Sequence, residues 1–86
     1  MSGRSRYSSN PAKAARLRAA RVAAGFATAR EAAQKFGWNE RRYRSHESAV
    51  GAISPIAARE YAQAFGISPE WLLEGRHPEW MLQERG

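Results

Sequence analysis

Hydrophobic and polar positions along this chain follow helical spacing. Apolar residues recur three and four positions apart in five blocks, each introduced by Ser, Thr, Asn or Pro and closed near a Gly. These blocks predict helices over residues 11–24, 28–36, 39–47, 55–65 and 69–74. No stretch alternates apolar and polar residues with the period of two that a half-buried strand requires. We therefore expect an all-α fold.

The residues that flank the five blocks are those that begin and end helices. Thr28 stands three residues before Glu31, which is the spacing of a capping box. The other four blocks have a polar cap at the same place: Asn10, Asn39, Ser54 and Ser68. Gly closes four blocks, at positions 25, 37, 66 and 75, and the third block is expected to end near Ser48 or Gly51.

The spacing of apolar residues also predicts which side of each helix packs inward. In the first block the predicted core face carries Ala14, Leu17, Arg21 and Val22. The predicted solvent face of the same block carries Lys13, Arg16 and Arg18. In the fourth block the predicted apolar stripe is Ile56, Tyr61, Ala64 and Phe65.

The chain has room for one domain, because 86 residues build a single hydrophobic core. Residues 11–75 are predicted to form that domain. Residues 1–10 are polar and basic and predict a flexible arm, whose Arg4 and Arg6 are candidate contacts to DNA, although a solvated tail is an equal interpretation. Residues 76–86 form a C-terminal extension in which Trp80 is a candidate dimer contact.

The charge of the chain narrows the class of partner. Its formal net charge is +6 and its pI is about 10.8, so polyanions are the favoured partners. Charge alone does not separate DNA from RNA or from an anionic membrane surface. No apolar run approaches the ~20 residues that span a bilayer, and residues 1–10 lack a secretory apolar segment. We expect a cytoplasmic, nucleoid-associated protein without a membrane partner.

Candidate catalytic and metal-binding residues are few. The chain has no Cys and two His, His46 and His77, with no metal-ligand spacing around either. Neither a nucleophile elbow nor a phosphate-binding Gly loop is present. We expect His46 to pack inside the domain, and we expect no enzymatic activity, no metal and no cofactor.

The second and third predicted helices form the most informative pattern. They are short, and only a turn at Gly37 separates them, which is the helix-turn-helix arrangement that presents its second helix to the major groove. That second helix carries Arg41, Arg42 and Arg44, and a guanidinium can hold a guanine edge or a phosphate. The alternative is an ordinary solvated basic helix. The preceding helix and turn favour a recognition helix at residues 39–47.

One family has the same order of segments across residues 16–75. The matching stretches are RLRAARVAAGF, AREAAQKFGW, YRSHES, AAREYAQAFGIS and PEWLLEG. The chain thus resembles the Cro and phage-repressor (XRE-like) helix-turn-helix family. The resemblance implies a compact five-helix, lambda-repressor-like domain that binds double-stranded DNA. It also implies a homodimer on an inverted repeat and a role in transcriptional regulation, with repression favoured.

The resemblance further implies which residues touch DNA. Base contacts fall on the start and middle of the third helix: Asn39, Glu40, Arg41, Arg42 and Ser45. Phosphate contacts fall on the second helix start and the third helix: Thr28, Ala29, Arg30, Arg44 and Ser48, with Arg42 also near phosphates. The chain departs from the family in three places, one of which is an additional residue before the second helix. Many members carry Gln near Ala29, and an Asn-Gly turn where this chain has Ser48 and Ala49.

Arg21 and Glu47 match a pair that, in this family, forms a buried ion pair bracing the domain. We assign both to structure, because an unpaired charge in a dry interior costs about 3–5 kcal/mol. Two other functions stay open from the sequence. One is an antitoxin that binds a toxin partner as well as operator DNA, which a co-purifying partner would reveal. The other is a non-specific nucleic-acid-binding protein, which would show no preferred site.

Overall fold

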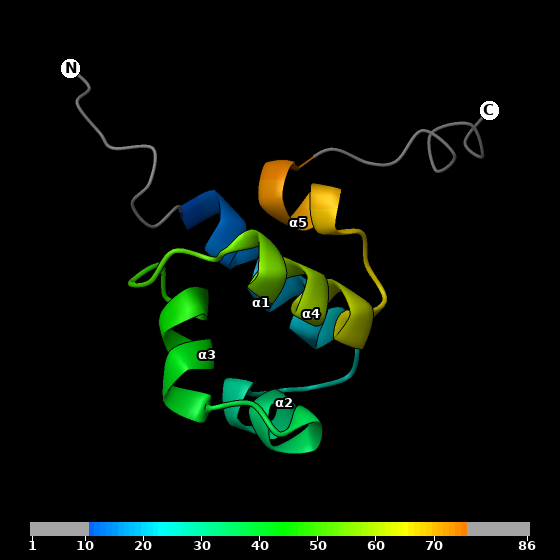
Figure 1. The fold of residues 1–86 in the computed structure, drawn as a ribbon. Helices are drawn as coiled ribbons and strands as arrows, with labels where there is room; N and C mark the ends of the chain where they lie inside the picture. Colours follow the sequence, from blue (N-terminus) through cyan, green and yellow to red (C-terminus); the bar gives the residue numbers. More distant parts are fainter. Residues whose placement is uncertain (1–10, 76–86) are drawn as a thin grey trace.

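The computed structural model describes residues 11–75, which form five helices and contain no strand, as the sequence predicted. The helices are α1 (Pro11–Ala23), α2 (Ala29–Phe36), α3 (Glu40–Glu47), α4 (Pro55–Phe65) and α5 (Pro69–Glu74). Figure 1 shows α1 and α4 crossing the middle of the molecule, with α5 at one end and α2 at the other. The expected cap at Asn10 lies outside the described residues.

Side-chain caps set the start of four helices. Thr28 Oγ1 accepts the Glu31 N–H at 3.1 Å, which is one half of the predicted capping box. The Glu31 carboxylate accepts the N–H of Ala27, one residue before the cap, at 2.9 Å, so the other half is shifted by one position. The same type of cap opens α3, α4 and α5, from Asn39, Ser54 and Ser68. Left-handed glycines end α2, α4 and α5, at positions 37, 66 and 75. These local signals explain why the observed helix bounds fall within one residue of those predicted.

The core combines small residues on α1, α2 and α4 with a group of aromatic rings. Leu17, Tyr43 and Leu72 are the largest fully buried side chains among the described residues. The rings that touch one another are Phe26, Phe36, Trp38, Tyr43, Tyr61 and Phe65. Alanines between them let helices approach closely enough for the rings to interlock.

Two residues predicted in the core lie on the surface instead. Val22 is 59% exposed and Ile56 is 75% exposed. Arg21, the neighbour of Val22, occupies the inward position because it meets a buried carboxylate there. Ile56 stands five positions before Tyr61, so it lies outside the buried face of α4, whose members follow three- and four-residue spacing. The prediction was wrong at both positions.

Arg16 was predicted on the solvent face of α1, but it is half-buried and caps α5. Its Nε donates to the Leu72 carbonyl at 3.0 Å and its Nη2 to the Leu73 carbonyl at 3.2 Å. These carbonyls lie in the last turn of a six-residue helix, where intrahelical donors run out. Arg16 therefore joins two helices that are far apart in the chain.

Within residues 11–75, no helix is long and apolar enough to cross a membrane.

Candidate nucleic-acid interface

The turn between α2 and α3 is held rigidly. Gly37 adopts φ 74°, and the Trp38 N–H donates to the Ala33 carbonyl at 2.9 Å. The Trp38 ring stacks on Phe36 with centroids 4.8 Å apart, and it meets Tyr61 edge-on at 4.8 Å. Packing on both sides of the turn fixes the direction in which α3 leaves α2.

The inner side of α3 is buried against three other helices. Tyr43 is 0% exposed, and His46 and Glu47 are each 6% exposed. The His46 Nδ1 lies 2.7 Å from the Tyr61 hydroxyl of α4. Burial, and then the Arg42 guanidinium, lower the pKa of His46, while burial raises the pKa of Tyr61 to about 12. The imidazole is thus a neutral packing group, in keeping with its predicted structural role.

The Tyr43 hydroxyl lies in the same interior. Among the described residues it is the one fully buried side-chain polar atom with no hydrogen-bond partner. Burial, followed by the neighbouring Glu47 carboxylate, raises the pKa of Tyr43 well above its usual value. The phenol therefore stays protonated, and a neutral oxygen lies next to the buried charges.

The outer side of α3 is basic and exposed. Arg41, Arg44 and Ser48 are exposed and share one side of the helix by three- and four-residue spacing. Ser45 lies on this side too, half-buried, with its hydroxyl donating to the Arg42 carbonyl at 3.0 Å. Glu40 flanks the group and pairs with Arg44 at 3.5 Å. The helix thus offers two guanidinium groups and two hydroxyls to solvent.

Arg42 and Asn39, both predicted base contacts, lie on the flank of α3 that faces α4. They line a cleft of about 190 Å³ together with Trp38, Ala57, Glu60 and Tyr61. The Asn39 side chain also accepts the Arg42 N–H at 2.9 Å as the helix cap. The structure therefore separates these two residues from the side that carries Arg41 and Arg44.

Arg21 and Glu47 meet inside the domain. Arg21 Nε lies 2.7 Å from Glu47 Oε2, with side chains only 10% and 8% exposed. Arg21 also donates to the Phe26 carbonyl at 2.9 Å. Arg18 is exposed, as predicted, and its guanidinium also donates to the main-chain oxygen of Glu47. Two arginines one turn apart on α1 therefore hold the end of α3. Their three-residue spacing puts both on the same side of α1, and this spacing is the sequence signal for the Arg18 contact.

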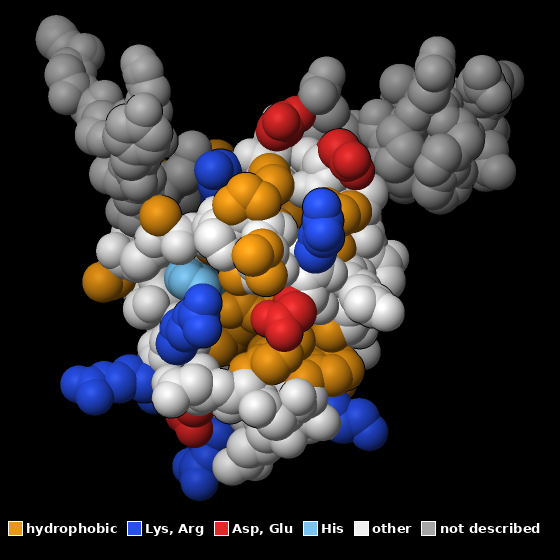
Figure 2. Space-filling model, in the orientation of Figure 1, with side chains coloured by type: hydrophobic (Ala, Val, Ile, Leu, Met, Phe, Trp, Pro, Cys, Tyr) orange, Lys and Arg blue, Asp and Glu red, His pale blue; other side chains and the backbone are white. Residues whose placement is uncertain are grey.

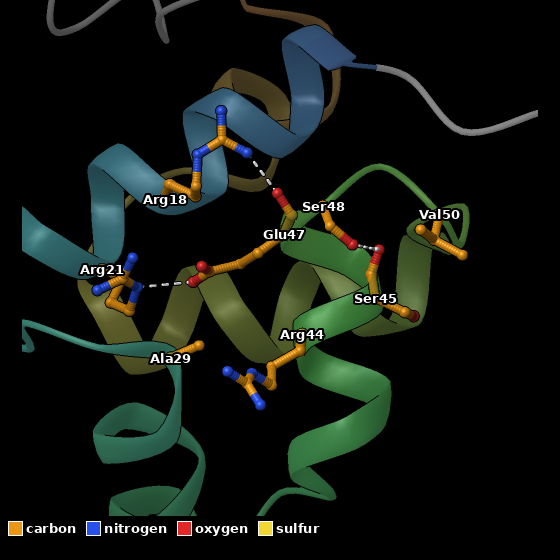
Figure 3. A pocket seen from close by; sticks show the side chains of 8 residues that line it. All are labelled: Arg18, Arg21, Ala29, Arg44, Ser45, Glu47, Ser48 and Val50. Carbon is orange, nitrogen blue, oxygen red and sulfur yellow. Dashed lines mark hydrogen bonds and ion pairs between the residues drawn. The ribbon is translucent and has the colours of Figure 1, made fainter.

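A hollow of about 600 Å³ lies where α1, the start of α2, the end of α3 and the following loop meet (Figure 3). Its lining consists of Arg18, Arg21, Ala29, Arg44, Ser45, Glu47, Ser48 and Val50. Ala29, a predicted phosphate contact, is half-buried there, and Thr28 and Arg30 beside it are exposed. The short Ala29 side chain leaves the hollow open at the first turn of α2.

No protein-family model, curated protein or solved structure matches this chain. The candidate interface therefore rests on the geometry of this chain alone. Predicted contacts Arg4 and Arg6, along with His77 and Trp80, lie outside the described residues. Residues 11–75 hold no group of three or more His, Asp or Glu side chains that could bind a metal.

Charge is unevenly distributed over the fold. Arginines and lysines are concentrated on α1, α2 and α3, whereas α4 and α5 carry Glu60, Glu70 and Glu74 against the single Arg59. In Figure 2, basic side chains project from the end of the molecule where α2 and α3 lie. The positive charge is therefore concentrated on the part of the domain that α1, α2 and α3 form.

Proposed function

We propose that this protein is a sequence-specific, double-stranded DNA-binding transcriptional regulator of the XRE-like type, which inserts α3 into the major groove. The observation that carries the proposal is the contrast between the two sides of α3. Its inner side is buried with an ion pair to α1, and its outer side is exposed and carries two arginines. A rigid helix with a basic outer side suits base reading, because the side chains need little ordering when DNA binds.

Each outer residue has a role in the proposal. Arg41, in the first turn, reads a guanine edge through its guanidinium fork. Glu40 accepts from a cytosine amino group, and Ser45 contacts a base one turn further along. Arg44 and Ser48 bind phosphates and set the register of the helix on the duplex.

The start of α2 forms the second part of the proposed interface. The first amides of a helix lack intrahelical acceptors and attract anions, so this end suits a phosphate beside Thr28 and Arg30. Arg42, a predicted base contact, lies on the α4 flank. For this reason we propose that it binds the DNA backbone beside the groove rather than a base. We further propose that the protein works in the cytoplasm, as a homodimer that places two α3 helices about 34 Å apart on an inverted repeat and represses transcription.

The test is selection of randomised duplex DNA on the purified protein at near-physiological salt, followed by sequencing. The proposal expects enrichment of an inverted repeat. The double variant Arg41→Ala/Arg44→Ala should lose the enrichment, whereas the matched double variant Lys35→Ala/Arg59→Ala should keep it. Binding without any enriched sequence would replace the proposal with non-specific nucleic-acid binding. Enrichment that requires a co-purified protein would favour the antitoxin alternative.

A further inference from the structure

The cleft between α3 and α4 carries two opposite charges over a buried floor. Arg42 of α3 and Glu60 of α4 are exposed at its rim, and we call it the Arg42–Glu60 cleft. Ala57 and Tyr61, each 4% exposed, form its floor, and the half-buried Trp38 completes its wall. In Figure 2, a basic and an acidic side chain lie on either side of apolar surface near the middle of the molecule, next to the pale blue histidine.

Neither rim charge is neutralised by the part of the chain that the structure describes. Within residues 11–75, Arg42 and Glu60 form no ion pair with each other or with another charged side chain. Burial is the main cause that raises the pKa of Tyr61, while the Arg42 guanidinium lowers this pKa and the Glu60 carboxylate raises it. Both charges therefore lie near the same ring without meeting each other.

This pair of charges indicates what kind of ligand suits the cleft. A simple anion would be attracted by Arg42 but repelled by Glu60, and the reverse holds for a simple cation. A ligand with both a carboxylate and an ammonium group would pair with both side chains, and its carbon would cover the apolar floor. The volume of about 190 Å³ is below the ~300–1,000 Å³ of sites for drug-sized ligands, so the ligand would be small.

The polar residues of the cleft also give such a ligand an orientation. Asn39 and Arg42 are three residues apart at the start of α3, and the Asn39 side-chain oxygen accepts the Arg42 N–H at 2.9 Å. The amide NH2 of Asn39 is left as a donor, so a carboxylate at this end would accept from both the amide and the guanidinium. Glu60, as a carboxylate, only accepts hydrogen bonds, which suits an ammonium group at the other end.

We propose that the Arg42–Glu60 cleft binds a free α-amino acid with an apolar or aromatic side chain. Its carboxylate lies on Arg42 and Asn39, its ammonium group on Glu60, and its side chain against the cleft floor. The free α-amino acids have this pair of charges on a small carbon frame. The inference does not rest on DNA binding, although a ligand that holds Arg42 would compete with the DNA backbone for it.

The first test compares an amino acid with analogues that each lack one charge. L-phenylalanine has both charged groups, phenethylamine lacks the carboxylate, and 3-phenylpropionate lacks the ammonium group. In NMR titrations of the full-length protein, L-phenylalanine should cause saturable shifts of the Trp38, Arg42 and Glu60 signals. Its Kd should be in the millimolar range expected of a ligand of about a dozen heavy atoms. Each analogue should bind at least about fivefold more weakly, the upper end for an exposed ion pair.

The second test removes the rim charges one at a time. Arg42→Gln and Glu60→Gln change exposed side chains, so both variants should fold, which thermal unfolding checks. Each should weaken the binding of L-phenylalanine at least about fivefold. Arg59→Gln and Glu70→Gln make the same charge changes at exposed positions outside the cleft lining, and each should change the Kd by less than about twofold because salt screens distant charges.

The outcomes decide the cleft proposal without reference to DNA. Weaker binding in both rim variants, with both control variants unchanged, would support it. Three results would overturn it: no saturable shift from L-phenylalanine or L-leucine up to about 20 mM, well above the expected Kd; an analogue that binds as tightly as L-phenylalanine; or binding that neither rim variant changes. A protein that binds L-phenylalanine in this way but selects no duplex would keep the cleft and lose the proposed DNA-binding function.

Discussion

The Tyr61 hydroxyl on α4 lies 2.7 Å from Nδ1 of His46 on α3, inside the helix pair. Burial first, and then the Arg42 guanidinium, lower the pKa of His46 below 6.5. The unfolded chain therefore binds a proton that the folded chain resists, in the window below pH 6.5. We expect the free energy of unfolding to fall as the pH drops from about 7 to about 5.

The measurement is urea unfolding at both pH values together with an NMR titration of the His46 ring. His46→Gln, which does not titrate, should remove most of the pH dependence. Arg42→Ala should move the ring pKa upward, because it removes a nearby positive charge. A ring that titrates at or above 6.5 in the folded protein would contradict the assignment.

Because the Arg21–Glu47 pair is buried, we expect substitutions at two glutamates of α3 to differ strongly in how much stability they cost. Glu47→Gln leaves Arg21 charged in the interior and should destabilise the fold by about 3–5 kcal/mol, as expected for a broken buried pair. Glu40→Gln removes an exposed i,i+4 pair with Arg44 and should cost about 0.5 kcal/mol or less. Chemical denaturation compares the two variants. Equal losses of stability in the two variants would show that the buried pair contributes no more than the exposed pair.

The double variant Arg21→Met/Glu47→Leu checks the origin of that loss. Replacing both charges by apolar groups of similar volume is often neutral or stabilising. We expect it to recover most of the stability lost in Glu47→Gln. A double variant as unstable as the single one would mean that the Arg21 bond to the Phe26 carbonyl is the larger contribution.

Ala49 is the only non-glycine residue with positive φ among residues 11–75, at 65°. An L-residue in this conformation costs roughly 1–2 kcal/mol, and glycine adopts it freely. Ala49→Gly should therefore stabilise the protein by about 0.5–1 kcal/mol after the extra freedom of the unfolded chain is counted. Ala52→Gly, in the same loop without positive φ, should destabilise by about 0.4–1 kcal/mol. Thermal or urea unfolding distinguishes the two signs.

The outer residues of α3 predict two kinds of binding defect. Arg41→Ala should weaken binding to a selected duplex by about 1–3 kcal/mol and relax one base preference. Arg44→Ala should weaken all duplexes alike and reduce the salt slope by about one. Anisotropy titrations against single-base variants of the site measure both effects. Equal losses on every duplex for both variants would refute base reading by Arg41.

Helix positions were predictable because their signals are local. Thr28 with Glu31, and Ser54 and Ser68 before Pro, each fix a helix start within a few residues. The all-α class followed from the same spacing. Long-range choices were less visible: the sequence did not show that Arg16 would reach across 56 positions to the end of α5.

Some features of the candidate interface follow from helical spacing alone, and others depend on how the helices pack. Helical spacing alone groups Arg41, Arg44 and Ser48, and these residues do share the exposed side of α3. Arg42 is one residue from Arg41, yet that step turns it toward α4. The hollow could not be predicted without knowing how α1 packs on α3, because Arg18 and Val50 are 32 positions apart in the chain and on different elements.

The bonds from Arg16 to the Leu72 and Leu73 carbonyls also bear on how the protein can be engineered. They hold α1 and α5 together, so a dye or fusion partner joined before Pro11 or after Glu74 would attach beside that pair of helices. Figure 1 shows this pair of helices with α5 away from α2. A circular permutant that joins the chain across this pair of helices and has its new ends in the 48–54 loop would free that loop without cutting α3.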